Sequence, residues 1–135
     1  MIVVDTNVIA YLWIPGVQTG RAETLLQRDP EWSAPLLWRS EFRNVLAGYL
    51  RRRRIDLETS LQIASAAEEH LSGREFSVAS AEILEAVARS RCSACDCEFV
   101  VLAQELGVPL VTSDRRILAD FPGVARSLEA SVERA

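Results

Sequence analysis

Short continuous runs of mainly apolar residues, separated by helix-like segments, are the feature that most constrains the fold of this chain. The clearest runs are Ile2–Val4 and Val108–Thr112, and briefer ones occur at residues 32–34, 76–78 and 124–125. Strands buried on both faces have this pattern, because helices cover both sides of a parallel sheet. The segments between the runs show helical spacing of apolar residues. The sequence therefore predicts an α/β fold with a central, mostly parallel sheet and helices on both faces.

Helix starts and stops are indicated by capping residues and glycines in the intervening segments. Thr6 is expected to cap a short helix, and Asp56 a longer one that Gly73 ends. With 135 residues, the chain is long enough for one core and too short for two ordinary domains. We therefore expect a single domain over residues 1–135, with a fraying tail from about residue 129. The expected helices cover residues 6–13, 21–28, 37–53, 57–72, 80–89, 93–106 and a short stretch after Asp114.

The charged residues exclude several classes of function. A net charge of −4 and an isoelectric point near 5.1 argue against a general nucleic-acid coat protein, so any contact with nucleic acid must be local. All 15 basic residues are arginines, which excludes a Walker-type phosphate lysine, a lysine Schiff base and a lysine general base. The only histidine, His70, is expected at the surface or at the C-terminal end of a helix rather than in a catalytic position.

One basic run stands out in this acidic chain. It consists of four consecutive arginines, Arg51, Arg52, Arg53 and Arg54, at the end of an expected helix. The run is either a solvated helix end, where cations meet the C-terminal dipole, or a set of RNA phosphate contacts.

Cysteine content and hydropathy add further limits. Cys92, Cys95 and Cys97 lie close together, but three thiols without a second group of ligands form half a zinc site at best. We therefore expect free cysteines in the core. No basic leader precedes an apolar stretch, and no apolar run approaches about 18 residues. We accordingly expect neither secretion nor a membrane span, and a cytoplasmic location.

Four carboxylates, here called the acidic quartet, stand where a parallel sheet would bring them together. Asp5 ends the first apolar run and Asp114 follows a later one, while Glu41 and Asp96 lie in the first turns of expected helices. Ligands of such sheets bind at the carboxyl ends of the strands. Crowded carboxylates raise one another's pKa, so the cluster is tolerable mainly when divalent cations neutralise it. Hard carboxylate oxygens suit Mg²⁺ or Mn²⁺, and such clusters usually serve chemistry on phosphates.

Each acid of the quartet also has a purely structural interpretation. Asp5 and Asp114 are possible helix N-caps, and Glu41 is a possible solvated residue of an amphipathic helix. Asp96 fits a capping box that begins at Ser93. No single acid decides between the two interpretations, so the case for a metal site depends on the four together.

Four blocks of sequence contain these acids, in order, over nearly the whole chain. They are residues 3–8 (VVDTNV), 40–46 (SEFRNVL), 93–103 (SACDCEFVVLA) and 109–114 (PLVTSD). Together the blocks resemble the PIN domain family, and most closely its VapC-like toxin ribonucleases. One departure is Cys95, where many members carry a tyrosine before the aspartate. This change alters packing beside the site and leaves the set of ligands intact.

The resemblance implies that the acidic quartet is catalytic and binds Mg²⁺ or Mn²⁺, with supporting groups from Thr6, Asn7 and Thr112. The chain would then hydrolyse RNA phosphodiesters as the toxin of a type II toxin–antitoxin pair, inhibited by a cognate antitoxin protein. Glu98 is expected to support the N-terminus of its helix, and Asp120 has no assigned role.

Other classes of function share some of these features. Phosphoacceptor receiver domains and phosphatases with an aspartate nucleophile also place acids at the end of a parallel sheet, but both use a lysine that this chain lacks. A PIN fold that serves as a nucleic-acid-binding or interaction module without catalysis stays open as the alternative.

Two kinds of protein contact are also expected. Trp13, Trp32 and Trp38 predict a homodimer, because large aromatic side chains concentrate at interfaces, although core packing would explain them equally. The antitoxin is expected to lay an apolar helix in a groove lined by the N-terminal helices and to direct an arginine at the acidic quartet.

Overall fold

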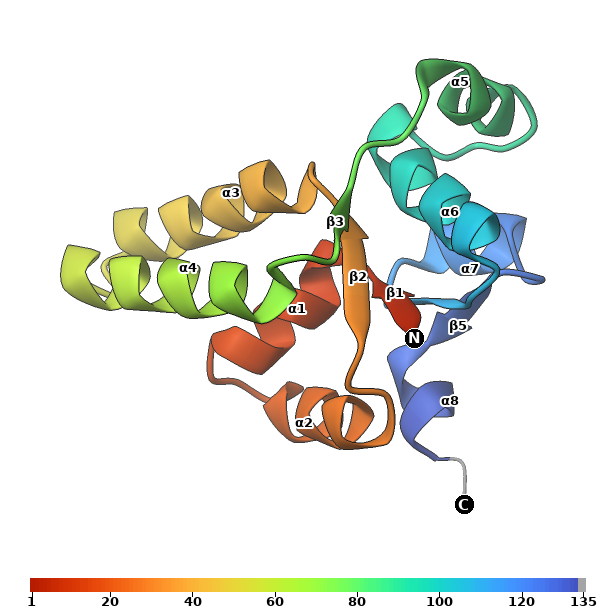
Figure 1. Ribbon diagram of the computed structural model, residues 1–135. Helices are drawn as coiled ribbons and strands as arrows, with labels where there is room; N and C mark the ends of the chain where they lie inside the picture. The colour runs from red at the N-terminus through yellow and green to blue at the C-terminus, as the bar shows by residue number, and fades with distance from the viewer. Residues whose placement is uncertain (134–135) are drawn as a thin grey trace.

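Five parallel strands form the centre of the molecule, which a computed structural model describes over residues 1–133 (Figure 1). The strands are β1 (Ile2–Val4), β2 (Trp32–Pro35), β3 (Glu75–Phe76), β4 (Leu110–Thr112) and β5 (Ala125–Ser127). Their spatial order is β3–β2–β1–β4–β5. In the central strand, Val3 lies opposite Ser33 of β2 and Leu110 of β4. All four pairings are parallel, so the predicted sheet is confirmed, and both edge strands follow the same direction.

Helices cover both faces of this sheet, as predicted. They are α1 (Thr6–Trp13), α2 (Thr19–Arg28), α3 (Trp38–Arg51), α4 (Leu57–Leu71), α5 (Ser80–Ala88), α6 (Ala94–Leu106), α7 (Arg115–Asp120) and α8 (Leu128–Val132). Figure 1 shows α1 to α4 on one side of the sheet and α5 and α6 on the other. The α3–α4 hairpin projects away from the sheet, and α3 begins near the end of β2.

The core explains why the strands lack an alternating pattern. Val3 and Val4 are fully buried, and every residue of β2 is buried, since both sheet faces are covered. Helix α6 packs against β1, β2 and β4 and buries Phe99 and Leu102 among others, which accounts for its weak amphipathic pattern.

Most helix starts follow the expected capping chemistry. Asp56 and Ser93 accept hydrogen bonds from the backbone N–H groups of Thr59 and Asp96, at 2.8 and 3.1 Å. The prediction for the first helix was wrong by one residue, because its cap is Asp5 and not Thr6. At the end of α6, Gly107 adopts a left-handed conformation with φ of 67°, which a residue without a Cβ adopts at little cost.

Helix α3 ends before Arg53, so the predicted helix over residues 37–53 was wrong at its C-terminus. The last residue of α3 is Arg51, and Arg52 caps it by donating its backbone N–H to the carbonyl of Gly48 at 3.1 Å. Arg53 leaves the helix in a left-handed conformation with φ of 55°, which is uncommon for a residue with a Cβ. Its N–H donates to the carbonyl of Leu50 at 3.0 Å. Arg53 thus lies in the turn that joins α3 to α4, a reversal that the apolar spacing did not indicate.

The predicted fraying tail is wrong for the residues that the structure describes. Residues 128–132 form α8, where Ser127 caps the N-terminus by accepting from the N–H of Ala130 at 3.1 Å. Leu128 is fully buried, and α8 packs against α2, so apolar burial stabilises a helix too short to persist alone. Residues 134 and 135 lie outside the described residues.

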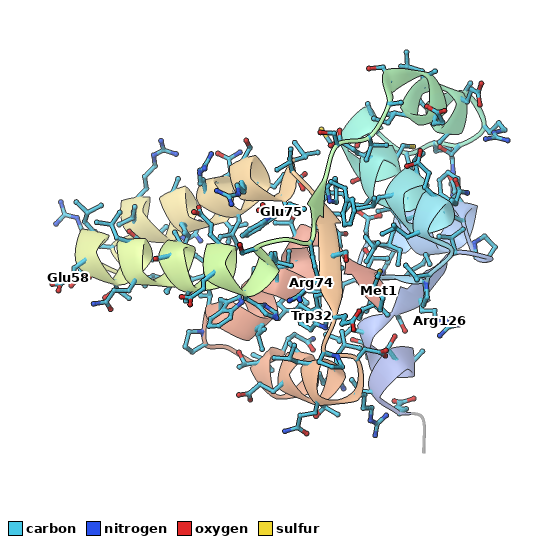
Figure 2. All side chains as sticks on the ribbon, viewed as in Figure 1. Met1, Trp32, Glu58, Arg74, Glu75 and Arg126 are labelled. Atoms are coloured by element: carbon cyan, nitrogen blue, oxygen red, sulfur yellow. The ribbon has the colours of Figure 1, made fainter. Side chains whose placement is uncertain are left out.

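The tryptophans pack inside the molecule, so the argument from them for a homodimer fails. Trp32 and Trp38 are fully buried, and Trp13 packs against the core with only part of its surface exposed. His70 lies in the last turn of α4, one of its two expected positions, but it is half-buried. Its ring centroid is 5.6 Å from that of Trp13 and 5.4 Å from that of Trp32. Arg74 closes this cluster by donating to the backbone carbonyls of Trp32 and His70, and Figure 2 labels it beside Trp32.

The three cysteines are free, as expected, but only two are in the core. Cys92 and Cys97 are buried, whereas Cys95 is exposed on the first turn of α6. The prediction of a core position was therefore wrong for Cys95, because the sequence does not tell which side of this helix faces the sheet. Within residues 1–133, no helix combines the length and the apolar character needed to cross a membrane.

Candidate active site

The carboxyl ends of β1 and β4 bring two acids of the quartet together. The two strands are neighbours in the sheet, and the backbone N–H of Asp5 donates to the carbonyl of Val111 at 3.0 Å. Asp5 therefore leaves β1 directly beside the end of β4, which Asp114 follows after two residues. Asp5 is 9% exposed, an unusually low value for a carboxylate.

A single hydroxyl connects these two acids. Thr112 donates to Oδ2 of Asp5 at 2.7 Å, and its Oγ1 accepts from the backbone N–H of Asp114 at 3.0 Å. The other Asp5 oxygen, Oδ1, accepts from the N–H of Thr6 at 2.7 Å. Both Asp5 oxygens are thus fixed, and each keeps a lone pair for another partner.

Glu41 reaches the site from the first turns of α3. Its Oε1 accepts from the hydroxyl of Thr6 at 2.7 Å, and its side chain is half-buried. The expected supporting roles of Thr6 and Thr112 therefore correspond to hydrogen bonds onto two acids of the quartet. Asn7 differs, because it is exposed and lies on a neighbouring groove, with no side-chain hydrogen bond among residues 1–133.

Asp96 stands at the first turn of α6. Ser93 caps this helix by accepting from the N–H of Asp96, but the Asp96 carboxylate makes no return bond, so only half of the expected capping box forms. Over the described part of the chain, no protein group donates a hydrogen bond to that carboxylate. It is therefore the acid of the quartet most available to an external ligand.

Asp114 is the N-cap of α7, as its structural interpretation predicts. Its Oδ1 caps α7 by accepting from the N–H groups of Arg116 and Ile117 at 2.9 and 3.0 Å. Its other oxygen is not used in this way, and the residue shares the lining of one cavity with Asp96. Capping therefore orients the carboxylate toward the site and leaves one oxygen for a ligand.

Burial and mutual repulsion shape the electrostatics of the site. Burial raises the pKa of the Asp5 carboxyl, and the hydrogen bonds from Thr112 and Thr6 oppose that rise. The negative charges of Asp96 and Asp114 add to it. The pKa of Glu41 is raised in the same way, first by burial, with the hydrogen bond from Thr6 acting against the rise.

Glu98 is a fifth acid at this site. Burial raises its pKa, and its negative charge contributes to the raised pKa of Glu41. The expected role of Glu98 at the helix N-terminus stays a prediction, and its charge also acts on Glu41 of α3. Its spacing of three residues from Cys95 places both on one helix face, and that spacing was the signal for it in the sequence.

Three arginines lie beside the acids, and none of them was predicted from the sequence to belong to the site. They line a cavity of about 460 Å³ at the quartet, which has only charged lining residues. These are Arg91, Asp96, Asp114, Arg115 and Arg116. Arg115 and Arg116 directly follow Asp114 in the sequence, which was the available signal.

The basic run of four arginines lies away from the acids. Arg51 is ten residues beyond Glu41 on α3, which corresponds to about 15 Å along the helix axis. The guanidinium carbon of Arg52 lies 5.2 Å from the centre of the Tyr49 ring, a cation–π contact within the same hairpin. The structure thus puts this run at the far end of the α3–α4 hairpin, and contact with RNA there stays a prediction.

The four arginines of this run do not act as one surface. Arg53 is exposed in the left-handed turn and lines neither the cavity at the quartet nor the groove beside it, whereas Arg54 lines that groove. Arg51 is the last residue of α3, Arg52 is its C-cap, and all four arginines are exposed, so the interpretation of the run as a solvated helix end agrees with the structure.

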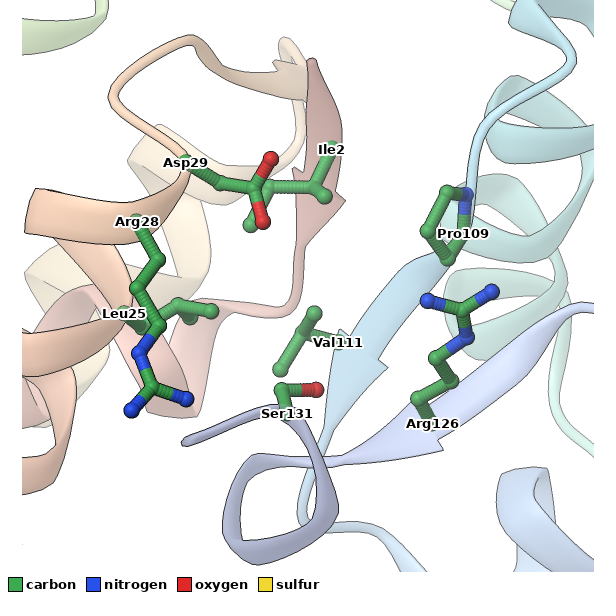
Figure 3. A pocket seen from close by; sticks show the side chains of 8 residues that line it. All are labelled: Ile2, Leu25, Arg28, Asp29, Pro109, Val111, Arg126 and Ser131. Carbon is green, nitrogen blue, oxygen red and sulfur yellow. The ribbon is translucent and has the colours of Figure 1, made fainter. Parts of the chain in front are cut away.

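A further cavity, of about 410 Å³, lies at the amino ends of the strands (Figure 3). Ile2, Leu25 and Val111 form its apolar part, and Arg28 and Arg126 approach it from different elements. No acid of the quartet lines this cavity, so it is separate from the candidate active site.

Comparison with protein-family models matches residues 2–124 to the PIN domain. The chain belongs to the PIN domain family. A search of curated proteins gave no match. PIN domains are generally nucleases, which are hydrolases, so membership of this family supports a nuclease function.

Solved structures with the same fold agree with this membership. PAE2754 from Pyrobaculum aerophilum is 19% identical with a TM-score of 0.77, covering 97% of this chain and 92% of its own. FitAcB from Neisseria gonorrhoeae is 15% identical with a TM-score of 0.76, covering 96% and 99%. A toxin–antitoxin complex from Klebsiella pneumoniae is 18% identical with a TM-score of 0.66, covering 95% and 98%. At these identities, the likeness shows that the PIN fold is shared over nearly the full length of each chain.

PIN domain nucleases typically use divalent metal ions, and the donors of this site fit such an ion. Within residues 1–133, no group of three or more acidic, histidine or cysteine side chains is already arranged to hold a metal ion. Mg²⁺ usually keeps several waters and takes one or two protein carboxylates, so a closed set of three is not needed. Asp96 and Asp114, which line one cavity and have free carboxylate oxygens, meet that requirement.

Proposed function

We propose that this PIN domain is a metal-dependent endoribonuclease whose acidic quartet binds Mg²⁺ or Mn²⁺. The observation that best supports the proposal is the burial of Asp5 among other carboxylates, which raises its pKa. A buried acid surrounded by like charges destabilises the folded protein unless a cation compensates it. Such a cost is expected where the acids serve binding and catalysis rather than stability.

Each residue of the site has a distinct part in this proposal. Asp96 and Asp114 would hold the ion through their free oxygens. Asp5 and Glu41 would add negative charge that attracts the cation. A bound divalent cation supplies Lewis-acid activation of water and of the scissile phosphate. The hydroxyls of Thr6 and Thr112 would keep Glu41 and Asp5 oriented, as the hydrogen bonds at 2.7 Å indicate.

Cleavage of RNA by purified variants tests this proposal. Wild-type protein is expected to cleave RNA only when Mg²⁺ or Mn²⁺ is added. Asp96→Asn is expected to lower the rate by about a hundredfold or more, as removal of a group that stabilises developing charge usually does. Glu105→Gln is the matched control, because it removes one charge from an exposed position on the same helix, α6. Undiminished metal-dependent cleavage by both Asp5→Asn and Asp96→Asn would contradict the proposal.

A groove beside the quartet supports an antitoxin as the partner. A groove of about 780 Å³ runs between α1, the loop that follows it, α3 and α4, and its lining is mainly apolar. It includes Tyr11, Ile14, Val45 and Tyr49, and it begins at Asn7, next to the residue that bonds Glu41. An apolar helix fits such a groove, and its end would lie close to the acids. The toxin–antitoxin complex among the similar structures agrees with this kind of partner.

Three further predictions complete the proposed function. The chain would be the toxin of a type II toxin–antitoxin pair and would act in the cytoplasm. The homodimer also stays a prediction, now without support from the buried tryptophans, and sedimentation velocity at micromolar concentration would decide it. The alternative, a PIN module that binds without catalysis, would be favoured if the cleavage assay gave no metal-dependent product.

A further inference from the structure

We infer that Arg115 and Arg116, assisted by Arg91, bind the RNA phosphates that flank the cleaved bond. The inference rests on the proposed ribonuclease function and names the groups that hold its substrate. It replaces the run of Arg51, Arg52, Arg53 and Arg54 as the principal RNA contact.

The position of the arginines is the first argument. Arg115 and Arg116 start α7, immediately after Asp114, and both line the charged cavity that Asp96 and Asp114 also line. Arg91 comes to the same cavity from the loop between α5 and α6. A phosphodiester held at the two carboxylates by a cation therefore has neighbouring phosphates within reach of guanidinium groups. Neither the apolar groove beside the quartet nor the cavity of Figure 3 contains an acid of the quartet.

The availability of these side chains is the second argument. Arg115 and Arg116 are exposed, and within residues 1–133 neither pairs with an acidic side chain, although two acids of the quartet share their cavity. By contrast, Arg39 forms ion pairs with Glu68 and Glu75 and is committed to the fold. Unpaired guanidiniums can each take a phosphate with two parallel hydrogen bonds.

Arg91 is held in place in a different way. Asp120, at the end of α7, accepts from the backbone N–H of Arg91 at 2.7 Å and from its Nε at 3.1 Å. A further bond from Nη2 completes the pair, and Nη1 is left without a protein acceptor in the described residues. This pairing fixes the loop of Arg91 to α7. Because Asp120 partly neutralises its charge, Arg91 attracts a phosphate less strongly than Arg115 and Arg116 do. The pairing also gives Asp120 a role that the sequence did not assign.

The charge of the molecule is the third argument. The chain carries a net charge of −4, and its site contains five carboxylates, so RNA would be repelled without local positive charge. Binding of a polyanion requires that counterions be displaced by protein cations near the phosphates. The three arginines that line the cavity provide that charge beside Asp96 and Asp114. Arg51, by contrast, lies about 15 Å from Glu41 along the axis of α3.

The test is RNA binding measured over a range of salt concentrations. A labelled single-stranded RNA is titrated with protein in EDTA, with Asp96→Asn present in every variant so that no cleavage occurs. Arg115→Gln/Arg116→Gln is expected to reduce the slope of log K against log salt by about 1.4, since each phosphate contact on a single strand contributes about 0.7. If the affinities converge near 1 M salt, the loss at 0.1 M is roughly 25-fold.

Two double variants serve as comparisons. Arg28→Gln/Arg126→Gln removes the same charge at the cavity of Figure 3, away from the quartet, and is expected to leave the slope unchanged. Arg51→Gln/Arg53→Gln tests the competing basic run. In the catalytic background, the Arg115/Arg116 variant is expected to raise KM for RNA with little change in kcat.

The outcomes separate this inference from the proposed function. Loss of slope confined to the Arg115/Arg116 variant supports the inference. An unchanged slope in that variant, or an equal loss in either comparison variant, overturns it while metal-dependent cleavage by the wild type keeps the function. Absence of both RNA cleavage and RNA binding by the wild-type protein overturns the two together.

Discussion

At the scale of single residues, the site is organised around one buried carboxylate. Asp5 caps α1, accepts from Thr112 and faces two other acids, so the same side chain stabilises a helix and carries an unfavourable charge. The hydrogen bonds depend on the shape of the carboxyl group, whereas the repulsion depends on its charge. Substitution separates the two effects.

Asp5→Asn is expected to leave the free energy of unfolding unchanged or to raise it by up to about 1 kcal/mol at pH 7 in EDTA. The amide keeps an oxygen for the N–H of Thr6 and can donate to Thr112, but it removes the charge. Because the folded-state pKa of Asp5 is raised above its ordinary value of 3.8, the gain is full above the folded-state pKa, decreases as the pH falls through it, and is gone below 3.8. Urea unfolding at several pH values measures this difference.

Asp5→Ala is the control for that prediction, because it removes the charge together with both hydrogen bonds. It is expected to be less stable than Asp5→Asn, as loss of a helix cap alone costs about 1 kcal/mol. Added Mg²⁺ should raise the free energy of unfolding of the wild type more than that of either variant, because the wild type is expected to bind the ion more tightly. A large loss of stability in Asp5→Asn without metal would mean that the charge itself holds the fold together.

His70 gives the opposite dependence on pH. Burial between Trp13 and Trp32 lowers its pKa, and the charge of Arg74 lowers it further. The unfolded chain therefore binds a proton more readily than the folded protein, so stability is lost as the pH falls below the ordinary histidine value of 6.5. His70→Phe keeps a ring between the indoles and removes the titration.

The measurement is urea unfolding of wild type and His70→Phe at pH 7.5 and 5.5, in EDTA. The variant is expected to lose less stability than the wild type between these two values. Protonation of the acids of the site affects the stability of both proteins equally. The difference between the two losses of stability therefore reports the contribution of His70 alone. Equal losses would show that the imidazole is not penalised for its charge in the folded protein.

At the scale of elements, α1 connects the two candidate surfaces of the molecule. Its first residue, Thr6, donates to Glu41 of the candidate active site, and its later residues Ala10 and Tyr11 line the apolar groove. A helix bound in the groove is therefore aligned with the acids by α1 itself. An arginine on such a helix could pair with the carboxylates in place of a metal ion.

Co-expression with the protein encoded by the neighbouring open reading frame tests this arrangement. The purified complex is expected to be inactive at low Mg²⁺ and to regain ribonuclease activity as Mg²⁺ rises, because cation and arginine compete for the same oxygens. Val45→Glu, which places a charge in the groove, is expected to weaken the complex. Failure of the neighbour to bind would remove the antitoxin from the proposed function, and inhibition independent of Mg²⁺ would remove only the competing arginine.

At the scale of the whole molecule, what could be predicted followed from connectivity. Parallel strands place their carboxyl ends at one edge, so the positions of Asp5 and Asp114 were predictable from the apolar runs alone. The side of a helix that faces the site depends instead on packing between elements, which no local pattern reports. For that reason the charge of Glu98 beside Glu41 was not predicted, Arg91 was missed, and the tryptophans were interpreted as an interface. The left-handed turn at Arg53 was missed for a local reason, because no glycine or asparagine marks it.

The bond from Thr112 to Asp5 spans 107 residues of sequence. A ribosome must therefore synthesise more than four fifths of the chain before the first acid acquires its hydroxyl partner, and Asp114 follows only two residues later. Whatever reaction the site performs, a nascent or prematurely terminated chain that ends before β4 lacks it. The hydrogen bond that fixes Asp5 at the site therefore forms only after the C-terminal part of the chain has been synthesised.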